Sequence, residues 1–362
     1  MVDTPEIQRK IKEIEAEILK TQKNKATEYH IGILKAKIAK LKRETFAPSK
    51  KSVKGGFDIK KEGDATVVII GFPSVGKSTL LNKLTNAKSE VAFYEFTTLT
   101  CIPGIMKYKD AYLQLLDLPG IIEGAAKGRG RGREIISVAR KADLIIILLD
   151  VEKAEAQQNK IVNELEGFGV RLNKKPKNIR IERVISGGIE IQSSPVFLRT
   201  ISKNEIVAVL NEYGIYHANV VLQDQITIND LIDHLESNRV YIPTLSVVNK
   251  IDKNKGKKFS IEYLGISAEE DIGLDKLRDA MYRKLEFIRI FTKRRGEKAD
   301  LEEALIMRRG HAIEDICTRL HKDLKKNFKY ALVWGKSAKH PGQRVGLKHP
   351  LEDGDIVQIY TK

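Results

Sequence analysis

Residues 71–78, Gly-Phe-Pro-Ser-Val-Gly-Lys-Ser, follow the pattern G-x-x-x-x-G-K-S of a phosphate-binding loop. The glycines of such a loop let backbone N–H groups curve around a phosphate chain. Its lysine reaches the β- and γ-phosphates, and its serine hydroxyl is a ligand for Mg²⁺. A β-branched run precedes the loop at 66–70, and leucines recur with helical spacing at 78–84. We therefore expect a buried strand, the loop, and a helix whose N-terminus faces the anion, rather than a chance match.

This loop supplies the first group of candidate ligands for a nucleotide. They are Gly71, Pro73, Ser74, Val75, Gly76, Lys77, Ser78 and Thr79. The candidate catalytic residues are Lys77 of this loop, which reaches the β- and γ-phosphates, Thr98 and Gly120.

Composition excludes several classes of protein. The 362 residues are 42% hydrophobic and 31% charged, which is typical of a globular protein of two or three domains. No apolar run reaches the ~18 residues of a membrane span, and the polar N-terminus is unlike a signal peptide. Cys101 and Cys317 form neither a disulfide framework nor a metal-binding pattern, so we expect a cytoplasmic location.

The net charge of +16 is concentrated at the two ends of the chain. Residues 1–60 carry 15 Lys/Arg against 8 Asp/Glu, and 289–362 carry 17 against 10, whereas 61–288 carry 32 against 30. Basic ends around a nearly neutral middle favour a polyanionic partner, with RNA or the ribosome first, and no signal specific to DNA is present. The alternative is a surface of solvated Lys and Glu, as in a thermophile.

The order of patterns predicts several domains. Apolar residues recur at helical spacing within 4–45, which indicates a helical hairpin whose stripes pack on each other or on the next domain. The middle alternates strands (66–70, 111–116, 143–150, 244–248) and helices, which is typical of a doubly wound, mostly parallel α/β sheet. The distance from Asp150 to Asn249 is too long for one crossover, so an insertion is expected.

Within the insertion, 179–184 and 189–192 flank Ser186-Gly187-Gly188, which predicts a hairpin, followed by a helix (203–213), a strand (218–222) and a helix (228–235). After residue 290, an amphipathic helix at 312–324 lies between short strands. The predicted domains are a hairpin (1–47), a linker (48–60), a nucleotide-binding domain (61–168 and 236–288), an inserted α+β subdomain (169–235) and a β-rich module (289–362).

Two further motifs follow strands of the predicted sheet. Asp117-Leu118-Pro119-Gly120 is a D-x-x-G, in which Asp117 holds Mg²⁺ through a water and the N–H of Gly120 meets the γ-phosphate. Before it, Phe96-Thr97-Thr98-Leu99 offers a threonine that completes the Mg²⁺ shell, unless this is an ordinary strand entry.

Asn249-Lys250-Ile251-Asp252 is an N-K-x-D motif. The two oxygens of Asp252 match the ring N–H and the exocyclic amine of guanine, an edge that adenine lacks. Lys250 covers the base face and Asn249 braces the loop. Ser267-Ala268 supplies a backbone N–H for the guanine carbonyl. Together the motifs predict a guanine-nucleotide site.

Ile121 follows the D-x-x-G glycine, where Ras-like GTPases have the glutamine that orients the attacking water. Isoleucine offers no hydrogen-bonding group, so we expect slow hydrolysis or help from a cation, a partner or Glu123. If Ile121→Ala abolishes turnover with intact affinity and fold, this expectation is wrong. Residues 127–133 (KGRGRGR) then form either a switch segment that contacts RNA or a solvated loop.

With these residues in hand, the chain resembles the developmentally regulated GTP-binding proteins, an Obg-related family, almost end to end. The resemblance rests on Gln22–Thr27, Gly71–Leu81, Tyr94–Thr100, Leu115–Gly124, Gly128–Arg133, Phe328–Gly335 and Leu351–Ile359. It implies a GTPase that uses Mg²⁺ held by Ser78, Asp117 and Thr98, the last chosen over Thr97 on this resemblance alone.

The resemblance also implies a C-terminal TGS domain of the β-grasp class and an insert similar to the second domain of a small-subunit ribosomal protein. It further implies ribosome association, a stabilising partner protein of the kind that eukaryotic members bind, and stimulation by K⁺. Many potassium-dependent GTPases have Asn where this chain has Ser74, so K⁺ stays open; matched KCl and NaCl turnover decides it.

Three functions compete at this point. The first is a slow Mg²⁺-dependent GTPase that acts on ribosomes or RNA. The second is a GTP-gated binding module whose hydrolysis is incidental. An ATPase is the third, and Asp252 argues against it.

Overall fold

The computed structural model describes residues 4–22, 27–46, 62–85, 102–118, 132–254, 263–294, 296–297 and 299–361. These residues form two compact units. The first unit contains the described residues up to 46 together with 163–241. The second unit contains those of 62–118, 132–162 and 242–361.

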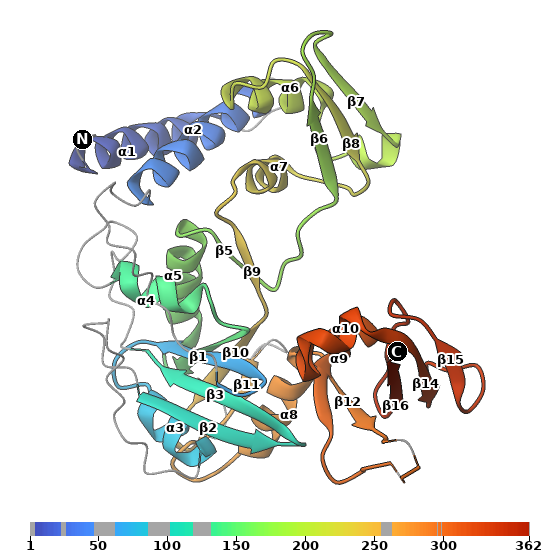
Figure 1. Ribbon diagram of the computed structural model, residues 1–362. Coiled ribbons are helices and arrows are strands. Elements are labelled where there is room, and N and C mark those ends of the chain that lie inside the picture. The colour runs from blue at the N-terminus through green and yellow to red at the C-terminus, as the bar shows by residue number, and fades with distance from the viewer. Residues whose placement is uncertain are drawn as a thin grey trace. The chain divides into compact units, whose positions relative to one another are not determined.

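A six-stranded sheet lies in the second unit (Figure 1). Its order is β11-β10-β4-β1-β3-β2, and every neighbouring pair is parallel except β2 and β3. The strands are β1 (Ala65–Gly71), β2 (Ile102–Tyr108), β3 (Ala111–Asp117), β4 (Leu144–Asp150), β10 (Thr244–Asn249) and β11 (Tyr263–Gly265). β1 is buried along its whole length, as expected for a strand covered on both faces. The predicted doubly wound, mostly parallel α/β fold is confirmed.

Helices follow several of these strands in the chain, and the first and the last of them, which contact β1 and β10, pack on the sheet. These helices are α3 (Lys77–Thr85), α4 (Gly132–Ala139), α5 (Ala154–Gly167) and α8 (Leu274–Lys284). The leucines that predicted α3 are buried: Leu80, Leu81 and Leu84 join one hydrophobic cluster with Ile69 of β1 and Leu115 of β3. This packing fixes the start of α3 directly after the phosphate loop.

The β-rich C-terminal part also lies in the second unit. Its sheet order is β13-β12-β16-β14-β15. The elements are β12 (Phe287–Thr292), β13 (Leu305–Arg308), α9 (Ile313–Leu320), α10 (Lys322–Lys326), β14 (Phe328–Trp334), β15 (Gln343–Val345) and β16 (Ile356–Thr361). Ile313, Ile316 and Cys317 of α9 pack against Ala331 and Val333 of β14. A helix lying on a mixed sheet agrees with the predicted β-grasp module.

The single helix predicted over 312–324 is wrong. His321 is extended, with φ −164° and ψ 137°, and separates α9 from α10. Its ring nitrogen Nδ1 accepts a hydrogen bond from the N–H of Asp323 at 3.3 Å and so caps the second helix. Leu324 still packs against the core, which is why the apolar spacing alone resembled one continuous helix.

The first unit combines the N-terminal hairpin with the insertion. Its elements are α1 (Thr4–Lys20), α2 (Glu28–Phe46), β5 (Val170–Leu172), β6 (Ile179–Arg183), β7 (Ile189–Ser193), the 3₁₀ turn η2 (Pro195–Leu198), α6 (Lys203–Glu212), β8 (Ala218–Leu222), α7 (Ile228–Leu235) and β9 (Val240–Ile242). β5 pairs with β9, and β6, β8 and β7 form a separate sheet in that order.

The hairpin predicted for 179–192 is therefore also wrong. β8 lies between the two strands and pairs antiparallel with β6 and parallel with β7. The connecting loop crosses the start of β8: the N–H of Val184 donates to the carbonyl of His217, and the N–H of Ala218 donates to that of Gly188. β8 buries Ala218, Val220 and Leu222 in the core, so the apolar strand takes the central position.

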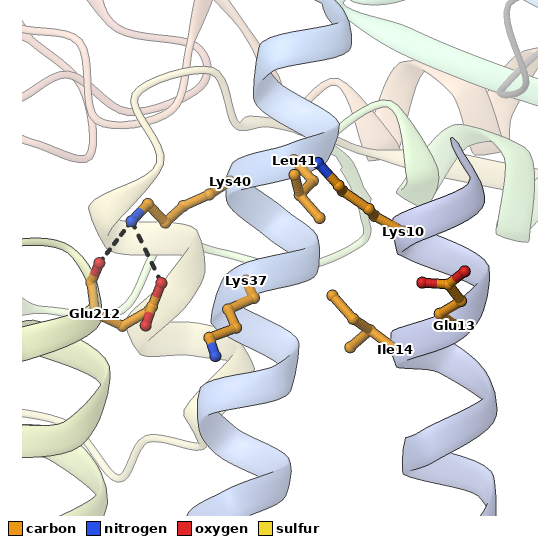
Figure 2. Close-up of a pocket in the computed structure, with 7 residues that line it drawn as sticks. All are labelled: Lys10, Glu13, Ile14, Lys37, Lys40, Leu41 and Glu212. Atoms are coloured by element: carbon orange, nitrogen blue, oxygen red, sulfur yellow. Dashed lines mark hydrogen bonds and ion pairs between the residues drawn. The ribbon is translucent and has the colours of Figure 1, made fainter. Parts of the chain in front are cut away.

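Helix α2 packs on the insertion as well as on α1. Ala36 and Ala39 are buried in the same cluster as Ile206 and Val209 of α6. Lys40 donates to the backbone oxygen of Glu212 at 2.6 Å, and its Nζ lies 3.4 Å from the carboxylate (Figure 2). A groove of about 350 Å³ is left there, lined by Lys10, Glu13, Ile14, Lys37, Lys40, Leu41 and Glu212. The hairpin and the insertion thus form one packed body. The sequence had left open whether the apolar stripes of the hairpin pack only on each other or also on another domain.

Among the described residues, no helix combines the length and apolarity needed to cross a membrane. The predicted domain boundaries stay a prediction.

Candidate nucleotide-binding site

The predicted motifs meet at one edge of the six-stranded sheet. Gly71 ends β1, Asp117 ends β3 and Asn249 ends β10, while Ser267 follows β11. In an open parallel sheet the carboxyl ends of the strands lie at the same edge, where ligands bind. The phosphate motifs and the base motif therefore face one site, which is distinct from the groove of Figure 2.

The glycines of the phosphate loop are required by close backbone approach. Gly76 has φ +94°, and a Cβ atom there would lie 2.5 Å from Nδ2 of Asn249. A Cβ atom on Gly71 would lie 2.5 Å from the carbonyl oxygen of Leu148. Ser74 also has a positive φ, of 62°. Neither glycine position leaves room for a side chain, so the loop backbone is held against its neighbours.

The phosphate end of the site contains two ionisable groups. Lys77 Nζ donates to the carbonyl of Phe72 at 3.1 Å, and burial lowers the pKa of its ammonium, against the opposing charge of Asp117. Burial raises the pKa of the Asp117 carboxyl, although a hydrogen bond from Ser78 and the charge of Lys77 act in the other direction. Burial thus disfavours the charged form of both groups, and a bound phosphate beside Lys77 or a bound cation beside Asp117 would favour it.

Ser78 and Asp117 fit the predicted role of Mg²⁺ ligands. Ser78 Oγ donates to Asp117 Oδ2 at 2.7 Å, so the hydroxyl and carboxylate lie together. The other oxygen, Asp117 Oδ1, is buried and has no hydrogen-bond partner among the residues that the structure describes. Oxygen ligands of this type suit a hard divalent cation. The third predicted ligand, Thr98, lies outside the described residues, as do Gly120, Ile121 and Glu123.

The base motif is bound to the phosphate loop by two successive residues. Asn249 Nδ2 donates to the carbonyl of Val75 at 2.8 Å, and Lys250 Nζ donates to the carbonyl of Ser74 at 2.8 Å. Asn249 Oδ1 also accepts from the N–H of Ala268 at 2.9 Å. One buried amide thus joins the phosphate loop, β10 and the segment after β11, which is the bracing role predicted for Asn249.

Asp252 lies in the 3₁₀ turn η3 (Ile251–Lys253), directly after Lys250 with its left-handed φ of 65°. Its Oδ1 is buried and lacks a hydrogen-bond partner among the described residues. Ser267 is fully buried, and its Oγ accepts from the N–H of Glu270 at 3.2 Å. An unpaired buried acceptor beside an ordered turn is the arrangement expected where a base supplies the missing donors.

The structure therefore brings most of the predicted residues together. Pro73, Ser74, Ser78 and Thr79 are exposed at the loop and the first turn of α3, while Val75 is buried beneath it. Their contacts with a nucleotide stay predictions. Sequence reasoning gave no role to Asp150, whose Oδ2 lies 2.8 Å from Lys250 Nζ. The one sequence signal that could have identified Asp150 is that this carboxylate ends a buried strand.

Comparisons with known proteins match three parts of the chain to described domains. Residues 66–183 match the family described as 50S ribosome-binding GTPase, 186–287 match the C-terminal region of the same domain type, and 288–361 match the TGS domain. An uncharacterized GTP-binding protein of Methanocaldococcus jannaschii is 50% identical over 99% of this chain and 94% of the relative.

Two animal relatives are similar over nearly the same length. Developmentally-regulated GTP-binding protein 2 of Homo sapiens is 49% identical over 98% of this chain and 100% of the relative. Developmentally-regulated GTP-binding protein 1 of Xenopus laevis is 49% identical over 98% of each chain.

Proposed function

The chain belongs to the developmentally regulated GTP-binding protein family and is a P-loop GTPase. From this premise we propose that it hydrolyses GTP to GDP with the help of Mg²⁺. We further propose that it acts as a switch in translation and associates with the ribosome or with RNA. A cytoplasmic location and a stabilising partner protein remain part of the proposal.

The observation that carries guanine binding is the position of Asp252. Its buried Oδ1 has no partner in the described part of the chain, and the turn that holds it follows directly on the two residues bound to the phosphate loop. A nucleotide whose base pairs with Asp252 thus places its phosphates at Gly71–Ser78. A base without paired donors leaves this acceptor buried and unsatisfied, which disfavours adenine.

Each residue has a separate task in the proposed reaction. Ser78 and Asp117 would hold Mg²⁺, which would supply positive charge that neutralises and orients the phosphates. Lys77 supplies a positive charge to the β- and γ-phosphates, and the loop N–H groups hold them in place. Ile121 has no hydrogen-bonding group that could orient the attacking water, so slow intrinsic hydrolysis is part of the proposal.

Replacing Asp252 with Asn tests guanine recognition. The amide presents a donor where the carboxylate only accepts, so affinity for GDP falls by at least about 100-fold, while xanthosine diphosphate, with a carbonyl in place of the amine, gains affinity. Titrations of GDP, XDP and ADP measure this, with Asp279→Asn as a control far along α8. A variant that still prefers GDP to XDP contradicts the role of Asp252.

Ribosome or RNA association is supported by the basic ends of the chain and by the match to a family described as a 50S ribosome-binding GTPase. Arg129, Arg131 and Arg133 are the first candidates for this contact, and their side chains lie outside the described part. Changing all three to Ala weakens ribosome binding and reduces its salt dependence. A control with an equal loss of charge is Lys153, Lys174 and Lys276 to Ala. Unchanged binding of the Arg variant across a salt series excludes this segment.

The second candidate is a GTP-gated binding module in which hydrolysis is incidental. Ile121, which cannot orient water, favours it. Single-turnover hydrolysis with and without ribosomes in matched KCl and NaCl separates the two, with Lys77→Ala as the inactive control. Acceleration by ribosomes supports the switch; binding that depends on GTP without acceleration supports the module.

A further inference from the structure

Asp150 occupies a special position in the sheet. It is the last residue of β4, and β4 lies between β1, which leads into the phosphate loop, and β10, which leads into the base motif. Asn249 is its register partner on β10. Asp150 therefore lies between the strand that leads to the phosphate loop and the strand that leads to the base motif. Its side chain contacts Lys250 of the base motif, a hundred residues later in the chain.

The two oxygens of Asp150 have different partners. Oδ2 accepts from Lys250 Nζ at 2.8 Å, and Oδ1 accepts from the N–H of Glu152 at 3.1 Å. The N–H of Asp150 itself donates to Gln157 Oε1 of α5 at 2.8 Å. Backbone and side chain are thus both fixed, and one oxygen is directed at the lysine of the base motif.

Lys250 needs such a partner to be ordered. Its four-carbon stem has several rotamers in solution, and its backbone is left-handed, with φ 65°. In the structure its Nζ is shared between Asp150 Oδ2 and the carbonyl of Ser74, both at 2.8 Å. With both ends of the side chain fixed, the course of the stem is fixed before a base arrives.

The carboxylate is in the charged form that this contact requires. Burial raises the pKa of Asp150, but the hydrogen bonds from Lys250 and from the N–H of Glu152, with the charges of Lys250 and Lys253, outweigh it and leave the pKa below its usual value. The side chains of Lys250 and Asp150 are 28% and 20% exposed, so solvent screens the pair only in part.

We propose that Asp150 is a positioning residue for nucleotide binding, which holds Lys250 against the phosphate loop so that the lysine stem is preorganised for the guanine base. This inference rests on the proposed guanine site and adds to it a residue from a strand outside the nucleotide motifs. Preorganisation lowers the ordering cost on binding, so its loss appears mainly as faster release of nucleotide.

The test is a double-mutant cycle on release of a fluorescent GDP analogue, measured by stopped flow. Asp150→Asn keeps the shape and the Oδ1 acceptor for Glu152 but removes the charge. We expect it to raise the dissociation rate by about tenfold, since a charge-assisted hydrogen bond becomes a neutral one. In a Lys250→Ala background the same change should have no further effect, because its partner is gone. Asp150→Glu, which keeps the charge, should recover part of the loss.

Asp279→Asn is the matched control, because it also removes a carboxylate from an ion pair with a lysine. Asp279 Oδ1 lies 2.7 Å from Lys109 Nζ, and this pair is remote from the nucleotide motifs. Thermal unfolding without nucleotide should be similar for both Asn variants. If Asp150→Asn releases the analogue at the wild-type rate, or accelerates release equally with and without Lys250, the positioning role is wrong while the guanine site stands. If the wild-type protein does not bind the analogue, the guanine site and this inference both fail.

Discussion

At the scale of single residues, the site depends on backbone contacts that only glycine permits. The Cβ atom of any other residue at position 76 meets Nδ2 of Asn249, the amide that joins phosphate loop and base motif. Alanine at this position must therefore either distort the loop or displace Asn249.

Gly76→Ala is expected to abolish nucleotide binding and to lower the free energy of unfolding by about 2–4 kcal/mol, from backbone strain and the lost buried hydrogen bonds. Calorimetric GDP titration and urea unfolding measure the two effects. Gly310→Ala is a matched control: its φ is +88° against +94°, but nothing lies within 4 Å of its Cβ position. Equal losses in both variants would show that strain alone, without the Asn249 collision, explains the result.

At the scale of elements, helix ends in the first unit are set by side chains next to them in sequence. Ser202 precedes α6 in a capping box: its Oγ accepts from the N–H of Glu205 at 3.2 Å, and Glu205 Oε2 accepts from the N–H of Ser202 at 2.6 Å. Ser194 precedes η2 but makes no side-chain cap.

Ser202→Ala should lower the free energy of unfolding of the first unit by about 1 kcal/mol, because the cap is lost and the buried Glu205 loses a donor. Ser194→Ala should leave it unchanged. Urea unfolding followed by circular dichroism is the measurement, and similar midpoints for the two variants would contradict the capping role.

The contact between Asp353 and Arg289 of β12 should make the stability of the C-terminal sheet depend on pH. Asp353 accepts from the N–H of Arg289 at 2.8 Å and from its guanidinium Nη2 at 3.1 Å. The hydrogen bond from Arg289 holds the pKa of this carboxyl below its usual value of 3.8, against the effect of partial burial. A lowered folded-state pKa contributes stability that is present above the unfolded value and lost as pH falls.

The free energy of unfolding should therefore decrease as pH falls below about 4, by less than about 1 kcal/mol from this pair, because both side chains are partly exposed. In Asp353→Asn this part of the pH dependence should be absent, with lower stability at neutral pH. Thermal unfolding from pH 3 to 7 compares the two proteins; parallel pH profiles would remove Asp353 as the source.

At the scale of the whole molecule, the N-terminal helices and the insertion share one core although about 120 residues separate them. Ala36 of α2 is fully buried with Ile206 and Val209 of α6, and the next residue, Lys37, is exposed. A change in the hairpin should therefore destabilise the insertion.

Ala36→Glu should raise hydrogen exchange in α6 and lower the stability of the first unit by at least about 2 kcal/mol, since an unpaired charge is buried. Lys37→Glu makes a larger change in charge at an exposed position and should leave exchange in α6 near the wild-type rate. An Ala36→Glu protein whose α6 is protected as in the wild type would show that the hairpin and the insertion are not one cooperative body.

Most of the nucleotide-binding sheet was predictable because its signals are local. The β-branched run that leads into Gly71 and the leucines of α3 each identify their element within a few residues. The strand order around β8 was not predictable. The glycines at 187 and 188 suit a tight hairpin between β6 and β7 as well as they suit the observed loop, which leaves room for β8 between these strands. His321 shows the same limit within one helix, since a single extended residue leaves the apolar spacing unchanged.

The sequence by itself predicted the chemistry of the site: which residues would surround a phosphate chain, which carboxylate would face a guanine, and which buried strands deliver them. These depend on residue type, spacing and local backbone preference. Only the tertiary structure decided that β8 separates β6 from β7, that α2 completes the core of the insertion, and that Asp150 meets Lys250. Such contacts join segments far apart in the chain, and they depend on which of several apolar surfaces pack best together, which no local pattern records.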